Sequence, residues 1–315
     1  MQVPFKFQET QRRSKLSLVY LQNSMPGGLE RQHGQPAELD PRNILDHGIE
    51  QLLIELKQGT TQRLENYLAF TARFHHYSVS NQMLIYMQCP QATFVAGYRK
   101  WQEMGYQVQR GQKGIRILAP RPYKRFNDKT GEEEQRLSFA AVSVFDVSQL
   151  LGVDEHPLPT FFGPLPDDQQ ELYEKLAQAV SEDGITLTEG ETGKAQGYSQ
   201  GKKIVLRKGM DSQNKLLTLI HEYAHELLHW DAEGKEQSRP VQECHAEATA
   251  FVVAHRFGIH NPYSADYLQN WGTTPQELKA ELEVVRKTAA YIIDRIEKPE
   301  ADVSNNKSGT FPEMI

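Results

Sequence analysis

Cysteine is nearly absent from this 315-residue chain, which contains only Cys89 and Cys244. Two cysteines cannot build the disulfide framework of a small secreted protein, so we expect a cytoplasmic protein. No apolar run approaches the roughly 20 residues that span a bilayer. The first residues also lack the sustained apolar core of a signal peptide. These absences predict a protein with no membrane partner.

Internal repeats and coiled-coil heptads are also absent, and the charge is unevenly distributed. Residues 1–150 hold 19 Lys+Arg and 14 Asp+Glu, whereas the remainder holds 16 and 27. The two halves therefore carry net charges of opposite sign, which suggests that each half has its own partner. The length and the 38% hydrophobic content favour two domains.

The hydrophobic pattern predicts an α+β protein. Residues 1–40 are polar, and we expect them to be disordered. Asp40 and Pro41 predict a helix start, and a further helix is capped by Ser80 or Asn81. The predicted helices lie within 40–59, 60–77 and 80–88, and β-rich segments follow at 92–98, 106–109, 114–123 and 137–147. Residues 41–151 thus predict a domain of helices with a small sheet.

A proline- and glycine-rich stretch, residues 152–168, is the predicted linker. The second domain, 169–297, begins with a helix. Strands are expected at 184–187 and 197–210, and helices at 211–230, 239–257 and 274–297. The polar tail, 298–315, is predicted to be disordered.

The segment "LTLIHEYAHELLHW", residues 217–230, carries an H-E-x-x-H motif. On a helix capped by Asp211 or Ser212, His221 and His225 lie one turn apart and can bind one metal ion. Glu222 lies beside them and can accept the proton of a metal-activated water. This spacing predicts a zinc metalloendopeptidase. The alternative is a metal site that only holds the fold together, although such a site has no use for a general base.

The third metal ligand is expected on the next helix, in "VQECHAEATAFVVAHRFGI". Its E-x-x-A-E pattern resembles the second glutamate helix of gluzincin peptidases. That resemblance implies that Glu243 binds the metal and that Glu247 braces a histidine, as an outer-shell carboxylate does. Glu247 and His245 remain alternatives for the third ligand. We interpret His229 as a helix-end residue or a partner of a ligand.

Two further features concern a substrate. The strand "KKIVLR", residues 202–207, could be an edge strand to which an extended peptide adds. Tyr198 could donate a hydrogen bond to a developing oxyanion, or could simply pack at a strand end.

Residues 98–125 contain eight Lys/Arg, a single acid (Glu103) and interleaved aromatic residues. Cations neutralise phosphates, and aromatic faces stack on unpaired bases, so this mixture favours single-stranded nucleic acid. A turn at "RGQKG" is expected to project Arg110 and Lys113 from a hairpin tip. The alternative is a solvated basic face whose aromatics, Trp101 above all, pack in the core. The candidate DNA-binding residues are Tyr98, Arg99, Lys100, Trp101, Arg110, Lys113 and Arg116.

Residues 77–120 resemble the N-terminal domain of the ArdC antirestriction family, and "TLIHEYAHELLH" with "ECHAEATAFVVAHRFGI" resembles its metallopeptidase-like domain, which is related to the ImmA/IrrE minigluzincins. The resemblance implies a single-stranded DNA-binding domain followed by a zincin-like domain with His221, His225 and Glu243 as ligands and Glu222 as base. Its histidine at position 245 departs from the expected pattern.

The resemblance also implies a function and a cofactor. The function is protection of incoming mobile-element DNA from restriction during conjugation. The cofactor is Zn²⁺, although two histidines and a carboxylate also suit Mn²⁺ or Co²⁺. Two alternatives are a DNA-dependent zinc metalloprotease that acts on DNA-bound protein substrates and an ImmA-like peptidase that cleaves a repressor.

Overall fold

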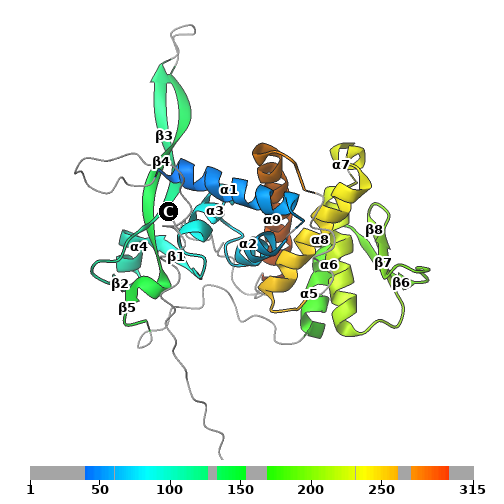
Figure 1. Cartoon of the computed structure of the whole chain (residues 1–315). Helices are drawn as coiled ribbons and strands as arrows, with labels where there is room; N and C mark the ends of the chain where they lie inside the picture. Colours follow the sequence, from blue (N-terminus) through cyan, green and yellow to red (C-terminus); the bar gives the residue numbers. More distant parts are fainter. Residues whose placement is uncertain are drawn as a thin grey trace, which may run out of the picture. The chain divides into compact units, whose positions relative to one another are not determined.

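The computed structural model describes residues 40–59, 61–126, 133–153, 169–230, 232–261 and 271–297. The predicted disordered segments at the two ends, apart from Asp40, and most of the predicted linker lie outside these residues. Helices and strands are both present, as an α+β protein requires (Figure 1). Within the described residues, no helix is long and apolar enough to cross a membrane.

The chain begins with three helices: α1 (Pro41–Lys57), α2 (Gln62–Arg73) and α3 (Val79–Gln88). The predicted start of α1 is confirmed, because Asp40 caps it by accepting the Arg42 N–H at 2.9 Å. The predicted cap of α3 is wrong by two or three residues. Ser78 is the cap, since its backbone is extended and its Oγ accepts the Asn81 N–H.

Strands β1 (Val95–Gly97), β3 (Ile115–Phe126) and β4 (Glu133–Asp146) form an antiparallel sheet in the order β1-β4-β3. Helix α4 (Tyr98–Glu103) follows β1. Strand β2 (Gln107–Val108) pairs with β5 (Leu150–Leu151), which follows the short 3-10 helix η1 (Val147–Gln149). The "RGQKG" turn therefore connects two different sheets, and the expected hairpin tip is wrong.

Two amide side chains of α3 hold this helix against β3. The Asn81 side chain donates to Leu118 O and accepts from Leu118 N, both at 2.9 Å. The Gln88 side chain makes the same pair of bonds with Arg116, again at 2.9 Å. Strand β3 lies at the edge of its sheet. The two amides therefore form hydrogen bonds with backbone N–H and C=O groups that have no neighbouring strand on this side.

The second half contains α5 (Gln169–Glu182), β6 (Thr186–Gly190), β7 (Gly197–Ser199), β8 (Lys203–Arg207), α6 (Ser212–Leu228), α7 (Ala232–Glu236), α8 (Arg239–Arg256) and α9 (Pro275–Glu297). The sheet has the order β6-β8-β7, with β6 parallel and β7 antiparallel to β8. The expectation that residues 202–207 form an edge strand is wrong, because β8 is paired on both sides. Strand β7 is an edge.

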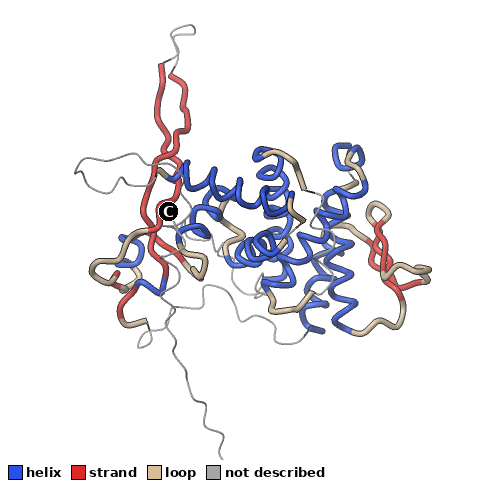
Figure 2. The backbone as a smooth tube through the Cα atoms, in the orientation of Figure 1, coloured by secondary structure: helices blue, strands red, loops and turns tan. Residues whose placement is uncertain are grey.

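Helices from both halves share one hydrophobic core, which runs from Leu45 on α1 to Ile296 on α9. Figure 2 shows the helices gathered together, with strands on either side of them. Helix α2 packs on α8, and α1 packs on α9. A smaller cluster around Trp101 fills the space between β1, α4 and the β2–β5 pair. The division at residues 152–168 stays a prediction, and the helices on its two sides are packed together.

Candidate metal centre and nucleic-acid surface

Helix α6 carries the H-E-x-x-H motif on the edge of its buried face. Its first turn is capped by Asp211, whose Oδ1 accepts the Asn214 N–H at 2.9 Å. The side chains that bury the helix are Leu216, Leu217, Leu219, Ile220, Tyr223 and Ala224. His221 and His225 flank this stripe and are each only partly buried. The cap and the 3.6-residue period therefore place both imidazoles beside a cavity.

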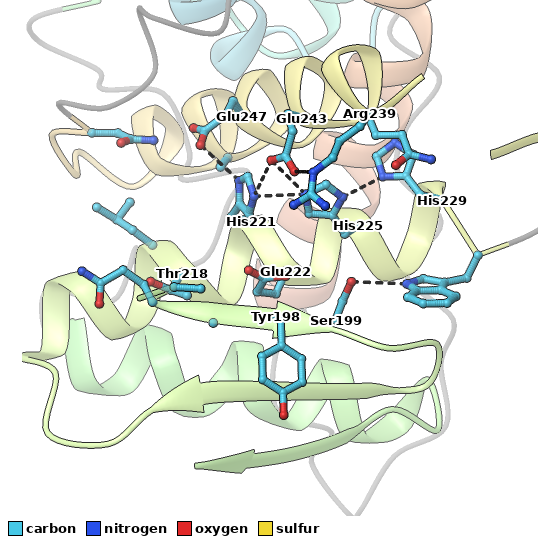
Figure 3. A pocket seen from close by; sticks show the side chains of 18 of the residues that line it. Tyr198, Ser199, Thr218, His221, Glu222, His225, His229, Arg239, Glu243 and Glu247 are labelled. Atoms are coloured by element: carbon cyan, nitrogen blue, oxygen red, sulfur yellow. Dashed lines mark hydrogen bonds and ion pairs between the residues drawn. The ribbon is translucent and has the colours of Figure 1, made fainter. Parts of the chain in front are cut away.

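Helix α8 packs against α6 and brings Glu243 to the two histidines (Figure 3). Glu243 Oε2 lies 3.5 Å from His221 Nε2 and 3.5 Å from His225 Nε2, and the two nitrogens are 3.1 Å apart. Three ligands around one zinc ion at ordinary bond lengths would be separated by about 3.4 Å. The three atoms thus fit a single divalent metal ion.

Each histidine has a partner on its other ring nitrogen. His221 Nδ1 lies 3.4 Å from Glu247 Oε1, and His225 Nδ1 lies 2.8 Å from His229 Nδ1. Burial lowers the pKa of His229 to about 3, so its ring is neutral and its Nδ1 can accept a hydrogen bond from His225 Nδ1–H. Such partners leave both Nε2 lone pairs for a metal ion. Glu247 and His229 therefore lie behind the two histidines, on the side away from Glu243.

His245, the other alternative ligand, does not join this group. It is buried, with its ring 6.3 Å from that of His229 and 6.4 Å from that of Trp271. The described residues that could hold a metal here are His221, His225 and Glu243. Burial lowers the pKa of His245 to about 4, so it is a neutral residue of the interior.

The pKa values of Glu222 and Glu243 are shifted in opposite directions. Hydrogen bonds with His221 and His225 hold the pKa of Glu243 well below its ordinary value, so it is an anion that can bind a cation. Burial raises the pKa of Glu222, which the two histidines only partly oppose. A raised pKa makes a carboxylate a better base near neutral pH. The two glutamates thus suit different tasks.

The cavity beside the histidines has a volume of about 880 Å³ and is bordered by α6, α8 and β7. Gly197 lets β7 approach α6, because an added Cβ would lie 2.8 Å from Thr218 Cγ2 and 3.2 Å from Glu222 Cγ. Glu226 accepts hydrogen bonds from the backbone N–H groups of Gln200, Gly201 and Lys202. These bonds hold the turn between β7 and β8 against α6. Sequence reasoning missed Gly197 and Glu226. A glycine at the start of a strand was the available signal.

Tyr198 follows Gly197 on β7 and borders the cavity. Its ring points away from the histidines and Glu222 in Figure 3. Ser199, the next residue, accepts a hydrogen bond from the Trp230 indole at 3.3 Å. In this conformation the Tyr198 hydroxyl is not placed to donate a hydrogen bond to an oxyanion beside the histidines.

The predicted DNA-binding residues differ in accessibility. Tyr98, Arg99, Arg110 and Lys113 are exposed, with 45% of Tyr98 accessible. Lys100 is half-buried and lies 3.5 Å from Glu103, and Arg116 is half-buried and donates to Ser143 Oγ at 3.2 Å. The exposed members come from α4 and the turn before β3, so they are spread over separate elements.

Trp101 corrects the sequence prediction. Its side chain is completely buried, and its indole N–H donates to Phe145 O at 2.9 Å. The ring contacts Phe94 and Tyr106 edge to face. A base cannot stack on this ring, because α4 carries Trp101 on the face that packs on the sheet. The packing alternative is the one observed.

The outer part of the β3–β4 ribbon adds an exposed surface that the prediction only partly included. From Pro120 to Phe126 every residue of β3 is exposed, and opposite them lie Leu137 and Phe139. The exposed aromatic and basic side chains are Arg121, Tyr123, Lys124, Arg125, Phe126, Arg136 and Phe139. Figure 1 shows this end of the ribbon extending beyond the helices. Arg136 and Phe139 were not predicted to belong to this surface. They lie opposite Tyr123 and Pro120 because of the register between β3 and β4, which the sequence does not show.

Residues 43–145 match the family model of the N-terminal domain of anti-restriction factor ArdC. An uncharacterized protein of Bacillus anthracis is 24% identical over 286 residues, which is 76% of this chain and 48% of that protein. The chain thus spans about half the length of this curated relative.

Two solved structures are similar in fold. The metal-free crystal structure of the antirestriction ArdC protein from plasmid R388 has a TM-score of 0.54 and 17% identity, and covers 81% of this chain and 98% of that one. Its Mn(II)-bound structure has a TM-score of 0.50 and 16% identity, with coverage of 80% and 98%. The likeness therefore extends through both halves of the chain.

Proposed function

We propose that this chain, which is an ArdC-like protein, is an antirestriction protein that binds single-stranded DNA and protects incoming mobile-element DNA. The observation that carries the proposal is the match of residues 43–145 to the ArdC N-terminal domain. Its work belongs in the cytoplasm, where entering DNA meets host nucleases. The region 41–151 would supply DNA binding, and the region 169–297 would supply a zincin-like metal domain.

The proposed DNA surface consists of Tyr98, Arg99, Arg110 and Lys113 together with the outer β3–β4 ribbon. Its cations are exposed and can neutralise phosphates. Its exposed rings, such as Tyr98 and Phe126, can stack on bases that are not paired. Base faces are covered in a duplex, so this combination favours single strands. Lys100 and Arg116 contribute charge from the border of the surface, and Trp101 supports it from the core.

The proposed cofactor is a divalent metal ion held by His221, His225 and Glu243. Two imidazoles and one carboxylate suit Zn²⁺, and also Mn²⁺ or Co²⁺. A bound ion of this kind supplies Lewis acidity and lowers the pKa of water toward 7. Glu247 and His229 orient the two histidines from behind. The donor set supports one ion at this place.

A second candidate function, metal-dependent proteolysis of DNA-bound proteins, is favoured by the position of Glu222. The residue is buried beside the histidines, next to the Gly197 stretch of β7. A carboxylate of raised pKa at this place can take the proton of water as it attacks a peptide carbonyl. Among the described strands, only β8 pairs with β7, so the other edge of β7 can pair with an extended peptide that lies along the cavity.

A conjugation assay tests the proposal. Unmodified plasmid DNA is transferred into a restricting recipient and into a restriction-deficient one, with wild type, Glu222→Gln or Arg99→Ala/Arg110→Ala/Lys113→Ala supplied. Wild type should raise recovery only in the restricting recipient, and the triple variant should not. Equal recovery with and without the wild-type protein would contradict the antirestriction role. Retained protection by Glu222→Gln would show that protection needs no hydrolysis.

A further inference from the structure

A second group of metal-binding side chains lies outside the α6–α8 site. His75 and His76 occupy the turn between α2 and α3, and Asp294 lies on α9. His75 is completely buried, whereas His76 and Asp294 are partly accessible. One ligand atom from each of the three lies within 4.8 Å of the others. Neither the DNA surface nor the proposed hydrolytic site uses these residues.

The hydrogen bond of His75 determines which of its nitrogens can bind a cation. Its Nδ1 lies 3.1 Å from the backbone carbonyl oxygen of Ala72, which can only accept a hydrogen bond. Nδ1 therefore carries a proton, and in the neutral ring Nε2 presents a lone pair. A histidine that binds a metal usually donates its other N–H to a carbonyl in this way.

The lone pair of His75 faces another acceptor. Nε2 lies 3.7 Å from Asp294 Oδ1, and both atoms are buried. Neither has a hydrogen-bond partner among the described residues. Two buried polar atoms that face each other without a hydrogen bond are costly, and a cation between them would remove that cost.

His76 supplies a third donor atom. Its Nε2 lies 3.4 Å from the same Asp294 Oδ1, and its ring is 4.1 Å from that of His75. A neutral His76 can offer a lone pair to a metal ion. Its partly exposed ring can also rotate to bring the three atoms closer.

The two nearby arginines do not prevent cation binding. Arg286 Nη2 lies 2.6 Å from Glu283 Oε1, and Arg256 Nε lies 2.6 Å from Glu297 Oε1. Each positive charge is therefore paired with a carboxylate. Asp294 supplies the negative charge that remains for the group itself.

We propose that His75, His76 and Asp294 bind a second divalent transition-metal ion, of the kind that accepts imidazole and carboxylate ligands. Two histidines and one aspartate match the preferences of Zn²⁺ and related ions. The ion fastens the α2–α3 turn to α9. Two hydrogen bonds already connect the same elements. The Val79 N–H donates to Glu283 at 3.1 Å, and Arg286 donates to His75 O at 2.8 Å.

The test is metal stoichiometry of the full-length chain without a histidine tag. The protein is stripped with a chelator, equilibrated with buffered micromolar Zn²⁺ and measured by inductively coupled plasma mass spectrometry. We expect about two ions per chain for wild type and about one for His76→Gln/Asp294→Asn. His225→Gln should also leave about one, and the combination of all three changes should leave none. His47→Gln removes an exposed histidine outside both groups and should retain two.

A Co²⁺ titration of the His225→Gln variant isolates the second group. Ligand-field absorption should appear when this variant is loaded with Co²⁺. It should be absent from a variant that carries both His225→Gln and Asp294→Asn. The residual ion at the first site in His76→Gln/Asp294→Asn reports that this variant is folded. If the double variant fails to fold, His76→Gln alone, at a partly exposed residue, should weaken the second binding step at least 10-fold.

The inference is overturned if wild type binds only one ion and His225→Gln removes it. It is also overturned if two ions bind and Asp294→Asn leaves both in place. Neither result depends on hydrolysis or on DNA binding, so the proposed function stands or falls separately.

Discussion

The candidate metal centre and the candidate DNA surface were both predicted from short segments, but their residues are arranged differently in the structure. In the candidate metal centre, three possible ligand atoms from α6 and α8 lie within 3.5 Å of one another. In the segment 98–125, the charged residues are divided among α4, a turn and β3. A regular helix converts sequence spacing into spatial position, whereas turns and short strands do not. Motif spacing therefore predicts a site best where one secondary structure carries it.

The largest effect that separates the two regions is expected for Glu222→Gln. The change removes the base without removing a ligand, so metal-dependent hydrolysis should fall roughly 10²–10⁴-fold at unchanged metal content. The measurement is cleavage of a protein bound to single-stranded DNA, with metal analysis of the same samples. Glu191→Gln makes the same change at an exposed glutamate and should have no effect. If Glu222→Gln and Glu191→Gln cleave equally well, Glu222 does not take part in the reaction.

The next effect concerns the cations of the DNA surface. In Arg99→Ala/Arg110→Ala/Lys113→Ala, the slope of log affinity against log salt should become shallower by about 2, because each phosphate contact on a single strand contributes roughly 0.7. Fluorescence anisotropy with a labelled oligonucleotide measures the slope. The matched control, Lys194→Ala/Lys203→Ala/Lys208→Ala, removes as many exposed charges from the other half. An identical change in both triples would show non-specific attraction only.

A smaller effect distinguishes the two aromatic residues of α4. Tyr98 is exposed, and Tyr98→Ala should weaken single-strand binding by roughly 1–3 kcal/mol if a base stacks on it. Trp101→Phe should leave the affinity of the folded protein nearly unchanged, while it lowers the melting temperature by removing the bond to Phe145 O. Anisotropy and thermal melting separate the two outcomes. If the folded Trp101→Phe protein loses DNA affinity and Tyr98→Ala does not, the assignment of Tyr98 to the surface and of Trp101 to the core is contradicted.

The smallest effect is a pH dependence of stability that is caused by the buried residue His245 on α8. Burial lowers the pKa of His245 from 6.5 to about 4, so the unfolded chain binds more protons between these values. Stability should therefore fall as the pH drops through this window, by about 1 kcal/mol between pH 7.5 and 5.5. In His245→Gln, the melting temperature of the metal-free protein should vary less with pH by a few degrees. An unchanged pH profile would mean that His245 is not buried as described.

Much of the fold was predictable, for reasons that particular residues show. The Asp40 and Asp211 caps and the apolar stripe of α6 are local signals, and they locate helices correctly. The central position of β8 was not predictable, because strand order depends on contacts between segments far apart in the sequence. The same applies to the burial of Trp101, since its residue type suits a core and a DNA surface equally well.

In the candidate site, helix periodicity predicts which residues lie together, whereas contacts that depend on packing were not predicted. His221, His225 and Glu222 follow from the spacing of one helix, and the distance of Glu243 from them depends on how α8 packs on α6. Gly197 and Glu226 act through close approach of β7 to α6, which no periodic pattern encodes. The His75–His76–Asp294 group joins residues more than 200 positions apart, and only the fold brings them together.

The division between the two regions is tested most directly by measuring metal content and single-stranded DNA affinity together in two variants. We predict that His225→Ala loses about one metal ion per chain and binds DNA as wild type does. The Arg99→Ala/Arg110→Ala/Lys113→Ala variant should retain its metal and lose DNA affinity. If His225→Ala retains all its metal, or if the triple variant binds DNA as tightly as wild type, the account of that region is contradicted.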